Sequence, residues 1–263
     1  MTAWKLRFDP NPDYGSGAFR RRIRLINRPG ATIAALDDSH HAMQCVLYHD
    51  GAQVTDIDAR MLRVPTTACP GAAVAIRELT GWRLDTPMTA LYGDGRPRRH
   101  CTHLFDLAVL AMAQARRTTP QRVYEAVVPD ETTAPVVAEV WRDGACVLAW
   151  QVSQGEIVTP AAWRGKPLVA GFAGWALTAL DGEALEAALV LHKAYFVSRG
   201  RRYLVNRAAG QPIGRNERMI GACFAYAPGQ VETARFIGDH VRDYSEAIVE
   251  TPLPTLRPEK EQQ

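Results

Sequence analysis

The chain has few cysteines and little net charge, and both absences exclude classes of protein. Its 263 residues include five cysteines, an odd number without the spacing of a disulfide framework, so we expect reduced thiols. A net charge of +3 is far below that of a dedicated nucleic-acid binder. No apolar run has the length of a membrane span, and no apolar export signal follows Met1. We therefore expect a cytoplasmic protein without nucleic-acid or membrane partners.

Several widespread motifs are also missing. The sequence contains no Walker phosphate loop, no Gly-x-Gly-x-x-Gly after a strand, no His-Glu-x-x-His and no Gly-x-Ser-x-Gly. These absences argue against nucleotide chemistry, nicotinamide chemistry and hydrolases with a nucleophile elbow. What is present is a globular composition, with 47% hydrophobic and 22% charged residues, which can build a substantial core.

Hydrophobic periodicity predicts that strands precede helices in the first half of the chain. Period-two runs, two of them separated by the hairpin signal Asp50-Gly51, predict strands over Arg20–Arg28, Ala31–Asp38, His40–His49 and Ala52–Val64. We expect the arginine-rich first strand to lie at a sheet edge. Helical spacing and the breakers Pro70 and Gly81 predict helices over 70–79 and 102–116.

The same order recurs in the second half. Period-two runs predict strands over Arg122–Pro129, Val136–Trp141, Ala145–Val152 and Glu156–Pro160, with Asp143-Gly144 as a second hairpin turn. Helices are predicted over 171–180 and 183–198. Two further strands are predicted over Arg201–Asn206 and Cys223–Tyr226.

This recurrence predicts an α+β fold of two degenerate tandem repeats, each an antiparallel sheet with helices packed on one face. We divide the chain into an N-terminal loop segment (1–19), a first repeat (20–118), a second repeat (119–250) and an extended C-terminal tail (251–263). A small-molecule site is expected between the repeats. Strand pairing makes a homo-oligomer possible.

Four phrases of the first repeat carry a resemblance to a known family. They are Arg20-Arg21-Arg22-Ile23-Arg24-Leu25, Leu36-Asp37-Asp38-Ser39-His40-His41-Ala42-Met43, Arg63-Val64-Pro65-Thr66-Thr67-Ala68-Cys69-Pro70-Gly71-Ala72 and Cys101-Thr102-His103-Leu104-Phe105-Asp106-Leu107-Ala108. Together they resemble a bacterial family called domain of unknown function 2889. The chain is also faintly similar to a lyase of lignin-dimer catabolism that releases formaldehyde from phenylcoumaran-type aromatics. That similarity implies a small aromatic substrate and no cofactor.

The first candidate site is the run Asp37-Asp38-Ser39-His40-His41. Strand alternation after it places His41 on the apolar face with Met43. A partly buried imidazole beside a carboxylate suits a general base, so we predict His41 as catalytic base and Asp38 as its orienting partner. His40 is predicted to bind substrate. The alternative is a turn in which Asp38 caps the backbone and the histidine is only hydrogen-bonded at a sheet end.

The second candidate site is Cys101-Thr102-His103. A helix beginning near Thr102 presents free N–H groups and a positive dipole end, which would ease ionisation of Cys101 and keep His103 neutral. We predict His103 as a catalytic residue and Cys101 as a substrate-binding one. The alternative is that Thr102 simply caps the helix.

The third candidate site lies at the start of the helix near Pro70. Arg63 is predicted as a catalytic cation for a developing phenolate, and Thr67 and Cys69 as substrate-binding residues. The alternative is that Pro70 and Gly71 only mark the change from a strand to a helix.

Other functions stay open at this point. His41, Cys69, Cys101 and His103 form a set of two nitrogens and two sulfurs, which leaves a zinc or iron site possible in a metal-binding protein or in a metalloenzyme of aromatic or steroid catabolism. A non-enzymatic ligand carrier is a further alternative. His192 is expected in the core beside Lys193. The aromatic residues, including Trp150, Trp163 and Trp175, are core residues or the wall of an aromatic pocket.

The leading hypothesis is a cofactor-independent carbon–carbon lyase that releases formaldehyde from a phenolic, lignin-derived dimer. Such a reaction needs a base for the primary hydroxyl and a donor for the developing phenolate. We assign the base to His41 with Asp38. Phenolate stabilisation is assigned to Arg63 with Thr67 or His103.

Overall fold

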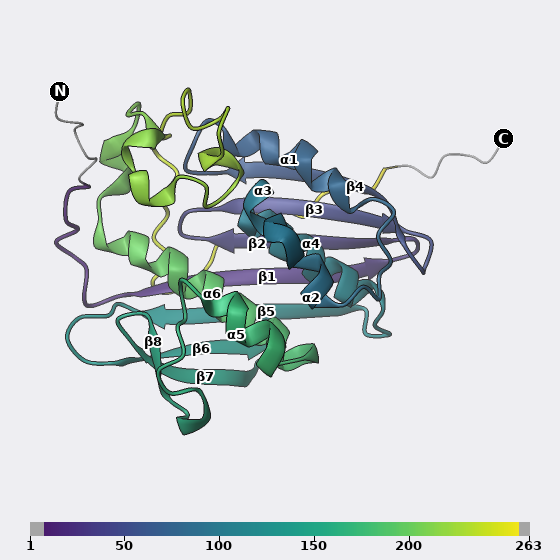
Figure 1. Ribbon diagram of the computed structural model, residues 1–263, viewed down its shortest axis with the longest axis horizontal. Coiled ribbons are helices and arrows are strands. Elements are labelled where there is room, and N and C mark those ends of the chain that lie inside the picture. Colours follow the sequence, from purple (N-terminus) through teal and green to yellow (C-terminus); the bar gives the residue numbers. More distant parts are fainter. Residues whose placement is uncertain (1–7, 258–263) are drawn as a thin grey trace.

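A single eight-stranded antiparallel sheet organises the chain, of which the computed structural model describes residues 8–257 (Figure 1). The strand order is β4-β3-β2-β1-β5-β6-β7-β8, so each half of the chain supplies four consecutive strands. The predicted α+β class is confirmed. The strands are β1 (Ala18–Arg28), β2 (Ala31–Asp38), β3 (Ala42–His49), β4 (Val54–Arg63), β5 (Gln121–Pro129), β6 (Val136–Arg142), β7 (Ala145–Ser153) and β8 (Glu156–Thr159).

β1 lies at the centre of this sheet, because it pairs antiparallel with both β2 and β5. The expectations of two separate sheets and of an edge position for β1 are therefore wrong. The arginines fit a central strand because they alternate between its faces. Arg21 faces the helices and pairs with Asp38, whereas Arg22 and Arg24 on the other face both form ion pairs with Glu250.

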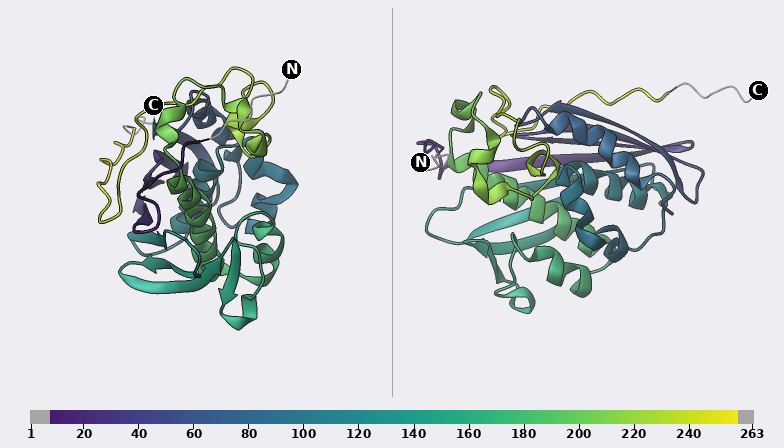
Figure 2. Two further views of the ribbon diagram at one scale, coloured as in Figure 1. Left: turned by 90° about the vertical axis from the view of Figure 1, so that its left-hand side faces the viewer. Right: turned by 45° about the horizontal axis from the view of Figure 1, so that its top comes forward.

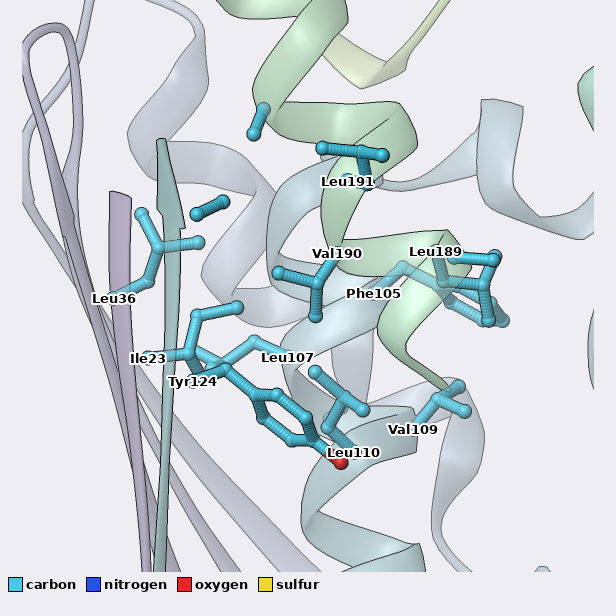
Figure 3. Packing of buried hydrophobic residues seen from close by; sticks show 14 of the residues in the cluster. Ile23, Leu36, Phe105, Leu107, Val109, Leu110, Tyr124, Leu189, Val190 and Leu191 are labelled. Carbon is cyan, nitrogen blue, oxygen red and sulfur yellow. The ribbon is translucent and has the colours of Figure 1, made fainter. Parts of the chain in front are cut away.

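All helices cover one face of the sheet (Figures 1 and 2). The two long ones are α4 (Thr102–Ala115), which packs on β1, β2 and β3, and α6 (Gly182–Ser198), which packs on β1, β5, β6 and β7. Ile23 of the sheet, Leu107 of α4 and Val190 of α6 meet in the buried core between the layers (Figure 3). The shorter helices are α1 (Ala72–Ala75), α2 (Met88–Leu91), α3 (Arg96–Arg99) and α5 (Phe172–Ala179).

The strands predicted over 201–206 and 223–226 are wrong. Those residues form short 3₁₀ helices, at Arg199–Arg202, Val205–Ala208 and Phe224–Tyr226. Arg201 is fixed by Asp130 (2.8 Å) and Arg202 by Glu131 (3.2 Å), which hold this segment against the end of β5. Of the residues predicted as strand, Ala225 and Tyr226 lie in a second buried cluster together with Ile213 and Phe236, whereas Tyr203 is 43% exposed.

The end of the described chain lies on the opposite face of the sheet (Figure 2). Residues 246–257 run there without helix or strand. Leu253 and Leu256 pack against the outward-facing Ala31, Ile33 and Val46 of β2 and β3. This segment is therefore the apolar cover of the sheet's first half. Within residues 8–257, no helix has both the length and the apolar character needed to cross a bilayer.

The double variant Leu253→Ser/Leu256→Ser is expected to lower the free energy of unfolding by about 1–3 kcal/mol, because both partly buried leucines lose apolar contact. Urea unfolding measures the change. Val249→Ser is the matched control, since Val249 lies in the same segment and is 75% exposed. Equal effects from the control and the double variant would show that the segment does not stabilise the sheet.

Candidate acid–base site

Asp38 is the centre of a buried polar cluster at the end of β2. It lies directly opposite Arg21 of β1, and both side chains are almost completely buried. Oδ2 of Asp38 accepts hydrogen bonds from Nε (3.0 Å) and Nη2 (2.6 Å) of Arg21. Burial alone would raise the pKa of Asp38, but the charges of His41 and Arg21 hold it well below its ordinary value. Asp38 is therefore a fixed carboxylate.

The second carboxylate oxygen shapes the turn that follows. Oδ1 of Asp38 accepts hydrogen bonds from the backbone N–H groups of His40 (2.7 Å) and His41 (2.8 Å). The same oxygen lies 3.1 Å from Nδ1 of His41. The capping turn and the oriented histidine, considered above as alternatives, thus occur together. One carboxylate sets both the backbone of the turn and the direction of the imidazole.

Arg63 donates hydrogen bonds to the backbone of this turn. Its Nη1 donates to the carbonyl oxygens of Ser39 (3.1 Å) and His240 (2.8 Å), and its Nη2 to those of Asp38 (2.7 Å) and His41 (3.0 Å). Both terminal nitrogens are therefore committed to backbone acceptors. This geometry assigns Arg63 to positioning the turn, in place of the predicted contact with a phenolate.

His103, in the first turn of α4, lies beside His41. The two ring centroids are 4.5 Å apart and the rings are inclined by 55°. Burial lowers the pKa of His103 well below its ordinary value, and the charges of His41 and Arg21 act in the same direction. His103 is therefore a neutral imidazole, as the sequence predicts. The two histidines keep only 7% and 8% exposure, so little of either ring is accessible to a ligand.

A second set of polar groups lies behind His103. Oδ2 of Asp106 is 3.7 Å from Nζ of Lys193, and Oδ1 of Asp106 accepts a hydrogen bond from the hydroxyl of Tyr92 (2.7 Å). Burial raises the pKa of Asp106, and the charge of Lys193 opposes this rise. Together with Arg21 and His103 these groups line a small cavity of about 10 Å³, which has room for about one water molecule.

His40 points to another neighbour, His240, with 5.7 Å between the ring centroids. Burial lowers the pKa of His40 to about 3 and that of His240 to about 4. The backbone of Gly200 lies against His40, so that a Cβ at Gly200 would be 3.0 Å from Nε2 of the ring. The segment after α6 therefore closes over this side of the turn.

The remaining predicted residues lie elsewhere. The hydroxyl of Thr67 accepts the backbone N–H of Arg235 (3.0 Å), and Sγ of Cys69 is 3.1 Å from the hydroxyl of Thr66. Cys101 is buried in the main core at the start of α4. Burial raises the pKa of Cys101 to about 12, so the expected ionisation by the helix N-terminus is wrong because desolvation outweighs the dipole. Across residues 8–257, no three His, Cys, Asp or Glu side chains converge in a group that could hold a metal ion.

Sequence reasoning missed Arg21, Asp106 and Lys193. Two signals for them were present. Arg21 alternates in phase with the apolar Ile23 of β1, which places it on the buried face, and Asp106 lies three residues after His103 on the same side of α4. Lys193 carried no comparable signal. Its neighbour His192 is half-buried, stacks on Phe172 at a centroid distance of 4.3 Å, and has its Nδ1 2.9 Å from the carbonyl oxygen of Leu168.

The comparison with known families fits this geometry. Residues 26–117 match the model of a family described as a protein of unknown function (DUF2889). The match covers about a third of the chain, and it confirms the resemblance to that family for the motifs that lie within this stretch. The matched stretch contains Asp38, His41 and His103, whereas Arg21 and Lys193 lie outside it. Comparison with curated proteins finds no match.

The histidines of the site make stability depend on pH. At pH 5 the folded chain keeps His40 and His240 neutral, whereas the same side chains in the unfolded chain, with pKa of about 6.5, are mostly protonated. Unfolding therefore takes up protons, and stability that is present above pH 6.5 is lost as the pH falls toward 4. We expect the free energy of unfolding to fall by about 1 kcal/mol per pH unit for each such histidine.

Urea unfolding at pH 7, 6 and 5 measures this slope. His240→Gln, which cannot titrate, is expected to make the slope shallower by about one proton. A free energy of unfolding that stays constant from pH 7 to 5 would contradict the assignment of neutral, buried histidines.

Proposed function

We propose that the chain is an enzyme that uses His41 as a general base. The observation that carries the proposal is the contact between Asp38 and Nδ1 of His41, because a carboxylate at Nδ1 leaves Nε2 to exchange a proton with a substrate. Within residues 8–257, no hydrogen bond occupies Nε2 of His41. Arg21 holds this geometry through its hydrogen bond to the carboxylate of Asp38, and Arg63 holds it through its hydrogen bond to the carbonyl oxygen of His41.

The reaction that we propose is the release of formaldehyde from a phenolic dimer of the phenylcoumaran type. His41 removes the proton of the primary hydroxyl, and the C–O bond becomes the carbonyl of formaldehyde. The adjacent carbon–carbon bond breaks, its electron pair forms a carbon–carbon double bond, and the aryl ether bond opens to a phenolate. The sum is redox-neutral and needs no external oxidant. The resemblance to a formaldehyde-releasing lyase supports this choice of substrate.

His103 is the group that we propose to stabilise the phenolate. It is neutral, lies beside His41 and can donate a hydrogen bond from its ring. Lys193 and Arg21 add positive charge behind it. The cavity behind His103 holds about one water molecule and cannot take an aromatic ring, so the substrate must reach the small exposed parts of His41 and His103.

The purified protein is expected to release formaldehyde from phenolic dimers in which the carbon that bears the hydroxymethyl group is bonded to the carbon of the aryl ether. His41→Gln is expected to lower kcat/KM by about 10²–10⁴, because general-base catalysis is lost. His49→Gln is the matched control, since His49 lies at the far end of β3, and it is expected to retain activity.

Two results would contradict this proposal. One is the absence of formaldehyde with every dimer of the panel, and the other is equal activity of His41→Gln and wild type. Elemental analysis of the same preparation distinguishes the proposal from the zinc or iron alternative, which requires about one equivalent of bound metal that activity depends on.

A further inference from the structure

The small cavity behind His103 has both polar and apolar lining residues. Its apolar lining comes from the sheet and from both long helices, and it includes Ile23, Leu107 and Val190 (Figure 3). The side chains that can form hydrogen bonds with a molecule in this cavity are Arg21, Tyr92, His103, Asp106 and Lys193.

Two buried atoms of these side chains have no hydrogen-bond partner within residues 8–257. They are Nδ1 of His103 and Oδ2 of Asp106. The two residues are three positions apart on α4, so their side chains are neighbours on one face of that helix. Buried polar atoms that no protein group satisfies are commonly joined by an ordered water molecule.

Lys193 approaches the same place without reaching Asp106 directly. Its Nζ is 3.7 Å from Oδ2 of Asp106, whereas a direct N–H···O hydrogen bond spans about 2.7–3.2 Å. The hydroxyl of Tyr92 donates to the other oxygen, Oδ1, so it does not compete for Oδ2. The cavity of about 10 Å³ has room for about one water molecule among these groups.

We propose that one water molecule in this cavity joins Lys193, Asp106 and His103, and that it fixes the proton of His103 on Nε2. The ammonium group of Lys193 can only donate, so it donates to the water oxygen. The two hydrogens of the water then go to the two atoms without partners, Oδ2 of Asp106 and Nδ1 of His103. A neutral imidazole whose Nδ1 accepts a hydrogen bond carries its proton on Nε2. Asp106 and Lys193 are thus positioning residues that act through His103.

Both charge states of Asp106 lead to the same tautomer. Burial raises the pKa of Asp106, so both states are relevant. When the carboxyl group is ionised, Oδ2 accepts a hydrogen from the water. When it is protonated, Oδ2 donates to the water instead. In either state Lys193 occupies the water oxygen as a donor, and a hydrogen of the water remains for Nδ1 of His103.

The tautomer decides what His103 can do in the reaction, and in this respect the inference rests on the proposed function. Nδ1 is fully buried, so the exposed part of His103 lies on its other atoms. With its proton on Nε2, a neutral His103 can donate a hydrogen bond to the developing phenolate. With its proton on Nδ1, the ring would offer a lone pair at Nε2, which would repel the same oxygen.

Nitrogen-15 NMR of the full chain labelled at histidine, at pH 7 and without substrate, shows which ring nitrogen carries the proton. The signals of His103 are those missing from His103→Gln. Wild type is expected to carry the proton on Nε2. Lys193→Met is expected to change the tautomer ratio about tenfold toward Nδ1–H, because the water then loses a charged donor that Nδ1–H can replace. Lys166→Met is the matched control, since Lys166 is exposed and does not line the cavity.

The inference is overturned if His103 of the wild type carries its proton on Nδ1, or if Lys193→Met leaves the same tautomer ratio as Lys166→Met. A crystal structure of the wild-type chain provides a readout that needs no variant. It is expected to show a water molecule within about 3.2 Å of Nδ1 of His103, Oδ2 of Asp106 and Nζ of Lys193. Direct contact of Lys193 with Asp106, without a water between them, also overturns the inference. Neither readout uses turnover, so a failure to release formaldehyde contradicts the proposed function alone.

Discussion

A carboxylate buried as completely as that of Asp38 costs several kcal/mol of lost hydration unless charges and hydrogen-bond donors surround it. Arg21, one strand away, supplies the charge, and the turn after β2 supplies two backbone N–H groups. Satisfying Asp38 therefore requires the β1–β2 register, the sharp turn and the inward direction of His41 at the same time. The geometry of the candidate site therefore follows from the interactions that offset the cost of burying Asp38.

The sequence predicted the elements better than their assembly. Period-two runs located all eight strands, and alternation placed His41 on the helical side, because both follow from local geometry. The central position of β1 could not be predicted, since the acids that pair with Arg22 and Arg24 come from distant segments. Burial also reversed the expectation for Cys101, because the desolvation of a thiolate depends on helices that meet only in the folded chain. The contact between Lys193 and Asp106 could not be predicted either, because it depends on the packing of α6 against α4.

The two halves of the chain share one order of strands but differ at the third strand and at the turn that precedes it. In the first half, the third strand is fully paired and its entry turn carries the histidines. In the second half, the equivalent turn is Asp143-Gly144, a plain hairpin, and the third strand is left partly open beside an apolar groove. The buried polar cluster thus lies in the first half of the sheet, and the apolar groove lies in the second half.

A double-mutant cycle between Arg21 and Asp38 tests the central claim most directly. Arg21→Met and Asp38→Asn each leave an uncompensated buried group, and each is expected to lower the free energy of unfolding by about 3–5 kcal/mol. The double variant removes both charges, so we predict that it costs about 2–3 kcal/mol less than the sum of the two. Additive losses, to within about 0.5 kcal/mol, would contradict the account, because the two side chains would then stabilise the fold independently.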